Sequence, residues 1–306
     1  MKVVVTPPSF CKSKTLKSRL TSLFPNTVFT ESLDYMSGIE LINFLQGADA
    51  AIIGRDKITR ATLDALPKLK MISKYGVGFD NLDLDAINQK GVALAVAEGT
   101  NKRSVAELTL SFMIGLCHNI FLSAERMKKG QWIRDGGQNL VGKTIGIIGC
   151  GNVGKEVIKL LQPFECNILV NDIEDKNEFC LEQNATESSF EVLINESDIV
   201  SLHVPLTTLT REMISERVLK VMKPTSFLIN TSRGHVVNHS ALHNALLLGE
   251  ISAAALDVFY PEPPEDFDFL RLPNLMVTPH IGGNSIEAVE AMGQAAIDNL
   301  LKFFNK

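Results

Sequence analysis

Short apolar runs alternate with segments of helical periodicity along the whole chain. In the first hundred residues, four runs bounded by glycine, proline or polar residues are typical of buried parallel strands: 2–7, 48–54, 70–76 and 92–97. Amphipathic stretches with the helical period, such as 37–46 and 61–69, lie between them. This alternation predicts a small β/α unit built on a parallel sheet.

A second, longer series of strands begins at residue 144. The pattern predicts strands at 144–149, 167–172, 198–204, 226–232, 253–259 and 275–280, with helical segments between most of them. One long helix over 104–130 joins the two series, with Ser104 as its N-cap and Glu107 completing a capping box. The predicted fold class is α/β, with two doubly wound parallel-sheet domains.

The chain has one more helical pattern after its last strand, over 285–305. This segment is too short to form a domain, so we expect it to cross back and pack on the N-terminal unit. The predicted domains are therefore 1–99 with 284–306, and 100–283, with a cleft between them. The length of 306 residues agrees with two domains.

Composition and charge exclude several classes of function. The net charge of -5 comes without a basic stripe, so we expect no nucleic-acid partner. No apolar stretch has the length of a membrane span and the start lacks a signal-peptide pattern, so we expect a cytoplasmic protein without a membrane partner. The five cysteines include no C-x-x-C pair, which favours reduced thiols.

The stretch "LVGKTIGIIGCGNVGKEV" at 140–157 combines a strand, three glycines and the start of a helix. In a dinucleotide-binding turn, Gly149 permits the tight turn, Gly151 lets a pyrophosphate approach the backbone, and Gly154 lets the helix lie close to the sheet. A glycine-rich turn also occurs where nothing binds. Here the preceding strand and the following helix supply the context that binding requires.

Two further features of this segment indicate which dinucleotide binds. The N–H groups of Asn152 and Val153 open the helix, where the helix dipole favours phosphate. Asp172 ends the second strand, where a carboxylate accepts hydrogen bonds from the adenosine ribose hydroxyls and repels a 2′-phosphate. Because no arginine follows in "NDIEDKN", the sequence predicts NAD rather than NADP.

Hydride chemistry also needs a proton donor and a group that holds an anionic substrate. Arg233, Asp257, Glu262 and His280 stand at or just beyond the ends of successive predicted strands. Ligands bind at the carboxyl ends of strands in open α/β sheets, so we expect these side chains to meet at one edge. Taken singly, each also has an ordinary structural explanation.

Three histidines, His235, His239 and His243, repeat every four residues. This spacing suits a metal-binding helix face, but the helix is expected to begin near His239, with no acidic third ligand nearby. We therefore expect no metal site. The acidic run at 261–269 is interpreted as a solvated loop in which Glu262 is the one functional carboxylate.

Seven ordered motifs carry a family resemblance along nearly the whole chain. They are "KYGVGFDNLDL" (74–84), "GTNKRSVAELTL" (99–110), "LVGKTIGIIGCGNVG" (140–154), "HVPLTTLT" (203–210), "NTSRG" (230–234), "ALDVFYPEPP" (255–264) and "TPHIGG" (278–283). The chain resembles the NAD-dependent D-isomer-specific 2-hydroxyacid dehydrogenases, in their phosphoglycerate dehydrogenase-like branch. The resemblance implies a Rossmann-type NAD-binding domain and a smaller flavodoxin-like substrate domain.

The resemblance also implies roles for individual residues. Arg233 would bind the substrate carboxylate and polarise its 2-oxo group, His280 would exchange a proton with the substrate oxygen, and Glu262 would hydrogen-bond His280. The implied substrate-binding residues are Lys74, Gly76, Val77, Gly78 and Asn101. Asp257 would contact the nicotinamide carboxamide, and the other implied cofactor-binding residues are Ser104, Gly149, Gly151, Asn152, Val153, Gly154, Asp172, Ile173, His203, Val204, Pro205, Thr210, Thr231, Ser232, Gly282 and Gly283.

Two departures from the family pattern bear on substrate and regulation. Lys74 stands where relatives often have an arginine facing a substrate phosphate, and a lysine pairs with phosphate only as a point charge. The chain continues only briefly beyond His280, so we expect a short form without a regulatory domain. The candidate substrates are 3-phosphoglycerate and related acids such as glyoxylate or hydroxypyruvate. Formate is disfavoured because the family's formate enzymes have Gln in place of Glu262.

Two further expectations concern partners. The alternative to an enzyme is an NAD-sensing corepressor-like interaction protein on the same fold. By resemblance, the region from Ser104 to about Arg126 forms a two-fold contact, which predicts a homodimer. Its apolar surface would include Phe112, Met113, Ile114, Leu116, Ile120, Phe121 and Leu122.

Overall fold

The computed structural model describes residues 1–305 and divides into two compact units. The first contains Met1–Asn101 and the C-terminal segment from Gly283, and the second is Lys102–Gly282. The chain therefore passes between the units twice. The boundaries expected from the sequence differ from these by two residues at the first passage and by one residue at the second. At the second passage, Gly283 belongs to the first unit rather than to the second.

The first unit is a five-stranded parallel sheet in the order β2-β1-β3-β4-β5, which is the flavodoxin-like order. Its strands are β1 (Val3–Val5), β2 (Thr27–Phe29), β3 (Ala50–Ile53), β4 (Met71–Lys74) and β5 (Ala93–Val96). The strand β2 is absent from the sequence prediction. Its three residues are only partly buried or exposed at the sheet edge, so they form no apolar run.

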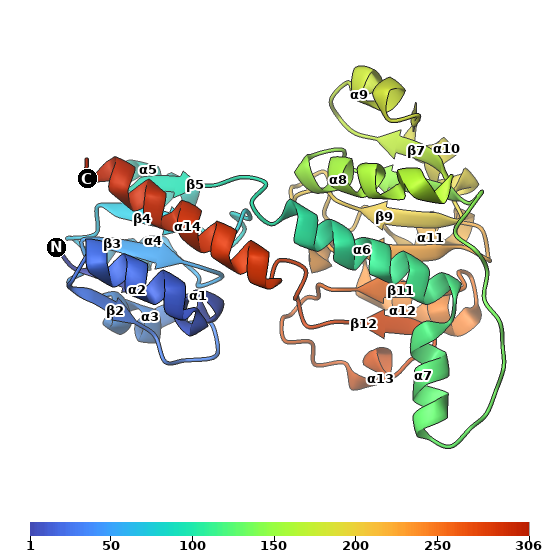
Figure 1. Ribbon diagram of the computed structural model, residues 1–306, viewed down its shortest axis with the longest axis horizontal. Helices are drawn as coiled ribbons and strands as arrows, with labels where there is room; N and C mark the ends of the chain where they lie inside the picture. The colour runs from blue at the N-terminus through green and yellow to red at the C-terminus, as the bar shows by residue number, and fades with distance from the viewer. Residues whose placement is uncertain (306) are drawn as a thin grey trace. The chain divides into compact units, whose positions relative to one another are not determined.

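Alternate residues of these strands enter two separate cores. On one face Val3 and Val5 pack with α1 (Pro8–Lys12), α2 (Lys14–Leu23) and α14 (Ile286–Phe303), of which α2 and α14 lie side by side in Figure 1. On the other face Val4 packs with α3 (Gly38–Leu45), α4 (Arg60–Asp64) and α5 (Leu84–Gln89). The C-terminal helix thus completes the first unit, as the sequence predicts.

The second unit is a seven-stranded parallel sheet in the order β12-β11-β10-β9-β6-β7-β8. The order reverses between β6 and β9, which is the switch point of a Rossmann-type sheet. The strands are β6 (Thr144–Ile148), β7 (Asn167–Asn171), β8 (Thr186–Glu187), β9 (Ile199–Leu202), β10 (Phe227–Asn230), β11 (Ala253–Leu256) and β12 (Leu275–Val277). All but the two-residue β8 correspond to predicted strands.

Helices cover both faces of this second sheet. One core contains residues of α6 (Lys102–Cys117), α8 (Asn152–Leu161) and α9 (Asn177–Glu182), with α6 beside α8 in Figure 1. The other contains residues of α10 (Phe190–Glu196), α11 (Glu216–Val221), α12 (His239–Leu248) and α13 (Phe267–Leu270). Two short 3₁₀ turns, η1 (Gln162–Phe164) and η2 (Gly234–Val236), follow α8 and β10.

The prediction of one long helix over 104–130 is wrong in two respects. The helix is broken into α6 and α7 (Ile120–Lys128), which meet at a bend of 66°. At the break, Asn119 adopts a left-handed backbone conformation with φ 52°. The first helix also begins earlier than predicted. It begins at Lys102 rather than after Ser104, so Ser104 is no N-cap and Glu107 completes no capping box. Glu107 instead accepts a 2.6 Å hydrogen bond from Arg103 Nε.

The apolar residues predicted to form one surface between Ser104 and about Arg126 are divided between the core and the exterior. Phe112, Met113 and Leu116 are buried in the second unit's own core, whereas Ile120 and Phe121 of α7 are about half exposed. Among the described residues, no single helix has both the length and the hydropathy of a membrane span. The bent α6–α7 pair meets those criteria only when its two helices are taken together.

Candidate functional site

The glycine turn after β6 has a shape that only glycine permits at two positions. Gly149 has φ 93°, and a Cβ there would lie 2.7 Å from the His203 carbonyl oxygen. A Cβ on Gly154 would lie 2.1 Å from the Gly149 carbonyl oxygen, so this glycine brings α8 against the turn. Gly151 is the N-cap of α8 and offers no side chain to the first-turn N–H groups. The helix therefore begins with backbone donors available to an anion.

Asp172 stands directly after β7, beside this turn. Its Oδ2 accepts a 2.6 Å hydrogen bond from the Cys150 N–H, and its Oδ1 accepts one of 3.0 Å from the Glu174 N–H. Burial raises the pKa of the Cys150 thiol to about 11, so this thiol is neutral at physiological pH. The next side chain, Ile173, is 95% exposed. A carboxylate and an exposed apolar surface thus stand together where an adenosine would follow the pyrophosphate.

His203, Val204 and Pro205 follow β9, the neighbour of β6 in the sheet. His203 Nε2 lies 2.9 Å from Ser201 Oγ, and burial lowers the pKa of this imidazole to about 3. The ring is therefore neutral at physiological pH. Its Nδ1 is buried and has no hydrogen-bond partner within residues 1–305. Thr210 braces the turn that follows, because its hydroxyl donates a 2.6 Å hydrogen bond to the Pro205 carbonyl.

Arg233 lies in the loop after β10, which a buried asparagine organises. The Asn230 Nδ2 donates to the Arg233 carbonyl at 2.9 Å, while its Oδ1 accepts from the Ser232 N–H at 3.0 Å and hydroxyl at 2.8 Å. Thr231 Oγ1 lies 3.0 Å from Thr109 Oγ1 of α6. The sequence interpretation missed this role of Asn230, although the residue opens the "NTSRG" motif. A strand-end amide followed by small polar residues is the signal that could have revealed it.

His280 and Glu262 form a hydrogen-bonded pair. His280 Nδ1 lies 3.1 Å from Oε1 and 3.0 Å from Oε2 of Glu262, and Oε1 also accepts a 2.9 Å hydrogen bond from the Phe259 N–H. Glu262 lies between two cis peptide bonds, Tyr260–Pro261 and Glu262–Pro263. The side chains of His280 and Glu262 are 27% and 16% exposed. The pair therefore combines a protected carboxylate with an imidazole that solvent and ligand can reach.

Asp257 directly follows β11 and is only 1% exposed. Its Oδ1 accepts from the Thr278 hydroxyl at 2.6 Å and the Ile281 N–H at 2.8 Å, and its Oδ2 accepts from the Gly282 N–H at 2.8 Å. Ser104 Oγ donates a 2.5 Å hydrogen bond to the Gly282 carbonyl. Asp257 and Ser104, both expected to touch cofactor, thus hold the loop that carries His280.

The expected substrate-binding residues all belong to the first unit, whereas Arg233, Glu262 and His280 belong to the second. Lys74 ends β4, is 4% exposed, and donates from Nζ to the Gly54 carbonyl. The loop at 76–78 follows it and is partly exposed, with Gly76 at φ 99°. Asn101 packs on Gly283, where a Cβ would lie 2.9 Å from Asn101 Nδ2. Gly283 therefore meets an expected substrate-binding residue.

The three regularly spaced histidines lie in an aromatic cluster. His235 stacks on Tyr260 with ring centroids 3.6 Å apart, and His239 and His243 contact Phe269. Burial and the neighbouring His235 lower the pKa of His239. Among residues 1–305, no group of three or more His, Cys, Asp or Glu side chains is arranged to hold a metal ion.

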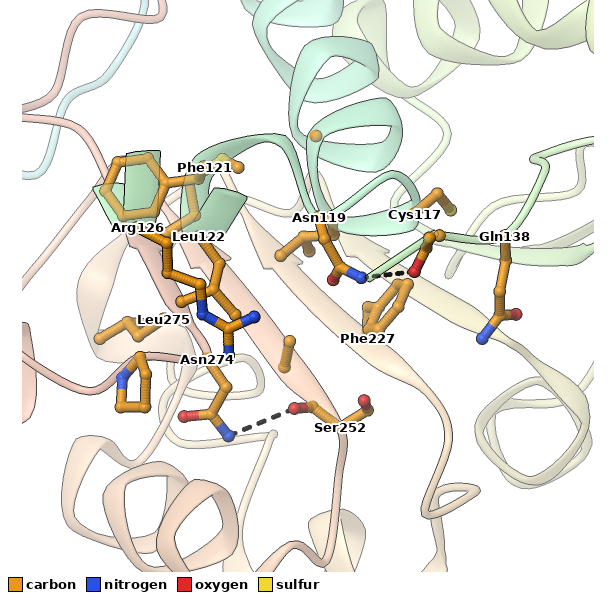
Figure 2. Close-up of a pocket in the computed structure, with 17 residues that line it drawn as sticks. Cys117, Asn119, Phe121, Leu122, Arg126, Gln138, Phe227, Ser252, Asn274 and Leu275 are labelled. Atoms are coloured by element: carbon orange, nitrogen blue, oxygen red, sulfur yellow. Dashed lines mark hydrogen bonds between the residues drawn. The ribbon is translucent and has the colours of Figure 1, made fainter. Parts of the chain in front are cut away.

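A pocket of about 430 Å³ lies at the amino ends of the strands of the second sheet, opposite the edge that Arg233 and His280 follow. Its lining includes the first residues of three strands, Phe227, Ala253 and Leu275. Figure 2 shows Phe121, Leu122 and Arg126 of α7 among the side chains around it. Because Arg233 and His280 follow the carboxyl ends of these strands, this pocket is separate from the candidate active site.

The residues at the carboxyl edge of the second sheet fit one kind of chemistry. The bare helix start and Asp172 fit the pyrophosphate and ribose of a dinucleotide. A guanidinium such as that of Arg233 binds a carboxylate through two parallel hydrogen bonds. An imidazole held by a carboxylate exchanges a proton with a bound substrate. Together they suit hydride transfer between a dinucleotide and a small organic acid.

Comparisons with known proteins agree with this geometry. Residues 110–282 match the model of the D-isomer specific 2-hydroxyacid dehydrogenase NAD binding domain. The chain is 37% identical over 281 residues to D-3-phosphoglycerate dehydrogenase of Methanocaldococcus jannaschii, covering 86% of this chain and 51% of that protein. It is 36% identical over 273 residues to glyoxylate reductase of Thermococcus litoralis, covering 86% and 82%.

A solved structure gives the same result for the fold. The chain aligns with D-lactate dehydrogenase of Aquifex aeolicus, complexed with NAD and lactic acid, with a TM-score of 0.88 and 27% identity. The alignment covers 99% of this chain and 96% of that one. The chain thus spans about half the length of the phosphoglycerate dehydrogenase above, and nearly the whole of this lactate dehydrogenase.

Proposed function

We propose that this chain, which belongs to the D-isomer specific 2-hydroxyacid dehydrogenase family of NAD-dependent oxidoreductases, interconverts a small D-2-hydroxy acid and its 2-oxo acid. The observation that carries the proposal is the His280–Glu262 pair, which shares the carboxyl edge of one sheet with Arg233 and a glycine turn. The cofactor is NAD, and the matched family domain is its binding domain.

The chain's own residues would divide the work as follows. Bound NAD(H) supplies the hydride or accepts it. Arg233 holds the substrate carboxylate and polarises the 2-oxo group, since a guanidinium offers both charge and a planar set of donors. His280 donates a proton to the carbonyl oxygen during reduction and accepts it during oxidation. Glu262 orients the imidazole through Nδ1 and favours its protonated form.

We further propose that the preferred substrate is an unphosphorylated 2-oxo acid, such as glyoxylate or hydroxypyruvate, rather than 3-phosphoglycerate. Lys74 supports this choice because it is 4% exposed and its ammonium donates to the Gly54 carbonyl. Turning it toward a phosphate would sacrifice a hydrogen bond made in a buried setting. Even then, a lysine would lack the bidentate fit of an arginine.

A substrate panel tests both the reaction and this preference. NADH oxidation is followed with glyoxylate, hydroxypyruvate, pyruvate and phosphohydroxypyruvate at equal concentrations, and each corresponding 2-hydroxy acid is tested with NAD in the reverse direction. We expect turnover, with the highest kcat/KM for an unphosphorylated acid. A higher value for the phosphorylated acid would overturn the substrate proposal, and failure of every acid would overturn the reaction. None of the comparisons described supports the corepressor alternative.

We propose that the protein acts as a homodimer through α7 and the segment that follows it. No residue of α7 is buried, and Phe121 and Met127 are 46% and 51% exposed. In the following segment Trp132 is 77% exposed. A nine-residue helix without a buried residue gains little stability from packing against its own chain. Exposed aromatic and aliphatic side chains gathered on one short segment favour association with a second copy.

We propose a cytoplasmic location from the state of the thiols. All five cysteines are unpaired, and burial raises the pKa of Cys11 and Cys166 to about 11. Neutral thiols that form no disulfide suit a reducing compartment. A fluorescent fusion imaged in the native cell tests this proposal, which a signal from an oxidising compartment would contradict.

A further inference from the structure

We propose that Asp257 is a positioning residue that sets the geometry of the His280–Glu262 pair through the backbone of residues 278–282. This inference rests on the proposed function, because it concerns the same proton-transferring imidazole. It gives the carboxylate a structural target that differs from the contact with the nicotinamide carboxamide implied by resemblance. Three features of the loop between β12 and α14 support this role.

First, Asp257 is buried and hydrogen-bonded to one short segment of the chain. Its carboxylate is 1% exposed and accepts hydrogen bonds from the Thr278 hydroxyl and from the Ile281 and Gly282 N–H groups. These three donors stand on both sides of His280. A buried charge that accepts three hydrogen bonds from one short segment stabilises the conformation of that segment strongly.

The second observation is the backbone of His280 itself. Its φ is 54°, in the left-handed region that side-chain-bearing residues rarely adopt. The His280 N–H donates a 3.0 Å hydrogen bond to the Thr278 carbonyl, which tightens the turn. Such a conformation persists only when its surroundings determine it. Asp257 supplies these surroundings by fixing the residues before and after the histidine.

The third observation is the close fit around Gly282. A Cβ on this residue would lie 2.9 Å from Asp257 Oδ2, so the glycine lets the carboxylate reach the backbone. Ser104 of α6 donates to the Gly282 carbonyl from the other side. The loop is therefore clamped between the end of β11 and the start of α6. Glu262 is fixed by the Phe259 N–H, two residues beyond Asp257. The residues that follow β11 thus position both His280 and Glu262.

The test separates positioning from cofactor contact. Asp257→Asn keeps the size of the side chain but replaces one acceptor oxygen with a donor. We expect kcat for 2-oxo acid reduction to fall roughly tenfold or more, with the Kd of NADH changed less than about threefold. The pH above which reduction fails should move lower, because a displaced imidazole loses the charge of Glu262.

A double variant makes the expectation sharper. If Asp257 acts through the pair, Asp257→Asn and Glu262→Gln should be non-additive, so that the double variant loses little more than the worse single variant. Asp266→Asn is the matched control: this carboxylate lies in the same region, is 60% exposed, and caps α13. It should change neither the pH profile nor kcat. A raised Kd for NADH with an unchanged pH profile would overturn positioning in favour of cofactor contact.

A measurement without turnover keeps this inference separate from the proposed reaction. The ring nitrogens of the six histidines can be titrated by NMR, and His280 is assigned as the signal lost in His280→Gln. In Asp257→Asn the midpoint of this titration should fall by about one unit. An unchanged midpoint would overturn the inference whether or not any acid is reduced. If Asp257→Asn does not fold, Thr278→Val removes one donor and should move the midpoint in the same direction by less.

Discussion

Nδ1 of His280 lies 3.0 and 3.1 Å from the two carboxylate oxygens of Glu262, although the two residues are 18 positions apart in the chain. In the proposed reaction, Nδ1 faces this carboxylate and Nε2 would be the nitrogen that meets the substrate. A carboxylate beside an imidazole also favours the protonated ring, which in that proposal gives the proton during reduction.

Glu262→Gln should lower the pH at which reduction fails. The amide oxygen can still accept a hydrogen bond from Nδ1 but carries no charge, so the protonated imidazole loses stabilisation and reduction fails about one pH unit earlier. At low pH, where the ring is protonated in any case, the loss should be modest. The measurement is kcat for 2-oxo acid reduction from pH 5 to 9. An equal loss at every pH would instead make Glu262 a purely structural residue.

Arg233→Lys should raise KM for the acid and lower kcat together. An ammonium retains the charge but cannot form two parallel hydrogen bonds to the carboxylate, and we expect each parameter to worsen by about tenfold or more. Steady-state kinetics at saturating NADH provide the measurement. Arg217→Lys, at an exposed position of α11, is the matched control and should behave as wild type. Wild-type kinetics for Arg233→Lys would remove the arginine from the proposed site.

Asp172 should make the enzyme prefer NADH over NADPH by at least about tenfold in kcat/KM, a difference of about 1.4 kcal/mol. The carboxylate stands beside the glycine turn and would repel a 2′-phosphate. Asp172→Ser should narrow the preference, while Asp175→Ser, which removes an exposed carboxylate of the same loop, should leave it unchanged. Equal efficiency of the wild type with both cofactors would contradict the assignment.

His203 should make the folded protein sensitive to acid. Burial lowers the pKa of its imidazole to about 3, so below its ordinary value near 6.5 the unfolded state takes up a proton that the folded state does not. The free energy of unfolding should therefore fall by roughly 1.4 kcal/mol per pH unit from this group as pH drops from about 6 toward 3.

Urea unfolding of the wild type and of His203→Gln at pH 7, 6, 5 and 4 measures this contribution. The variant has no group that titrates at this position, so its stability relative to the wild type should improve steadily as the pH falls. A constant difference between the two proteins across the series would show that His203 is protonated alike in the folded and unfolded states.

Phe121→Glu together with Trp132→Glu should yield a monomer. Both side chains are substantially exposed, at 46% and 77%, so the charges cost little in the isolated chain but much in an apolar interface. Light scattering at micromolar concentration measures the mass, and thermal unfolding confirms that the variant folds. Ile39→Glu, at a 70% exposed position of the first unit, is the control and should leave the mass unchanged. A wild-type monomer would contradict the proposed dimer.

The sequence by itself determined the glycine turn and every strand except the short β2 and β8. Runs such as 144–149 and 253–259 predict buried strands because a parallel sheet covered on both faces needs continuous apolar residues. The requirement for glycine at Gly149 and Gly154 is likewise local, since it follows from a tight turn and a close helix. The order of strands and helices then limits the topology to a doubly wound sheet.

Only the tertiary structure decided which polar groups meet. Ser104 has the local pattern of an N-cap, but the helix starts at Lys102 and its hydroxyl bonds the distant Gly282 carbonyl. Lys74 is expected from the resemblance to face substrate, and only the structure shows that it is 4% exposed and that its ammonium donates to the Gly54 carbonyl. The family resemblance implies a cofactor contact for Asp257, and only the structure shows that its carboxylate accepts hydrogen bonds from the Ile281 and Gly282 N–H groups beside His280. Hydrogen bonds between residues far apart in the chain depend on packing, which local periodicity and turn chemistry do not encode.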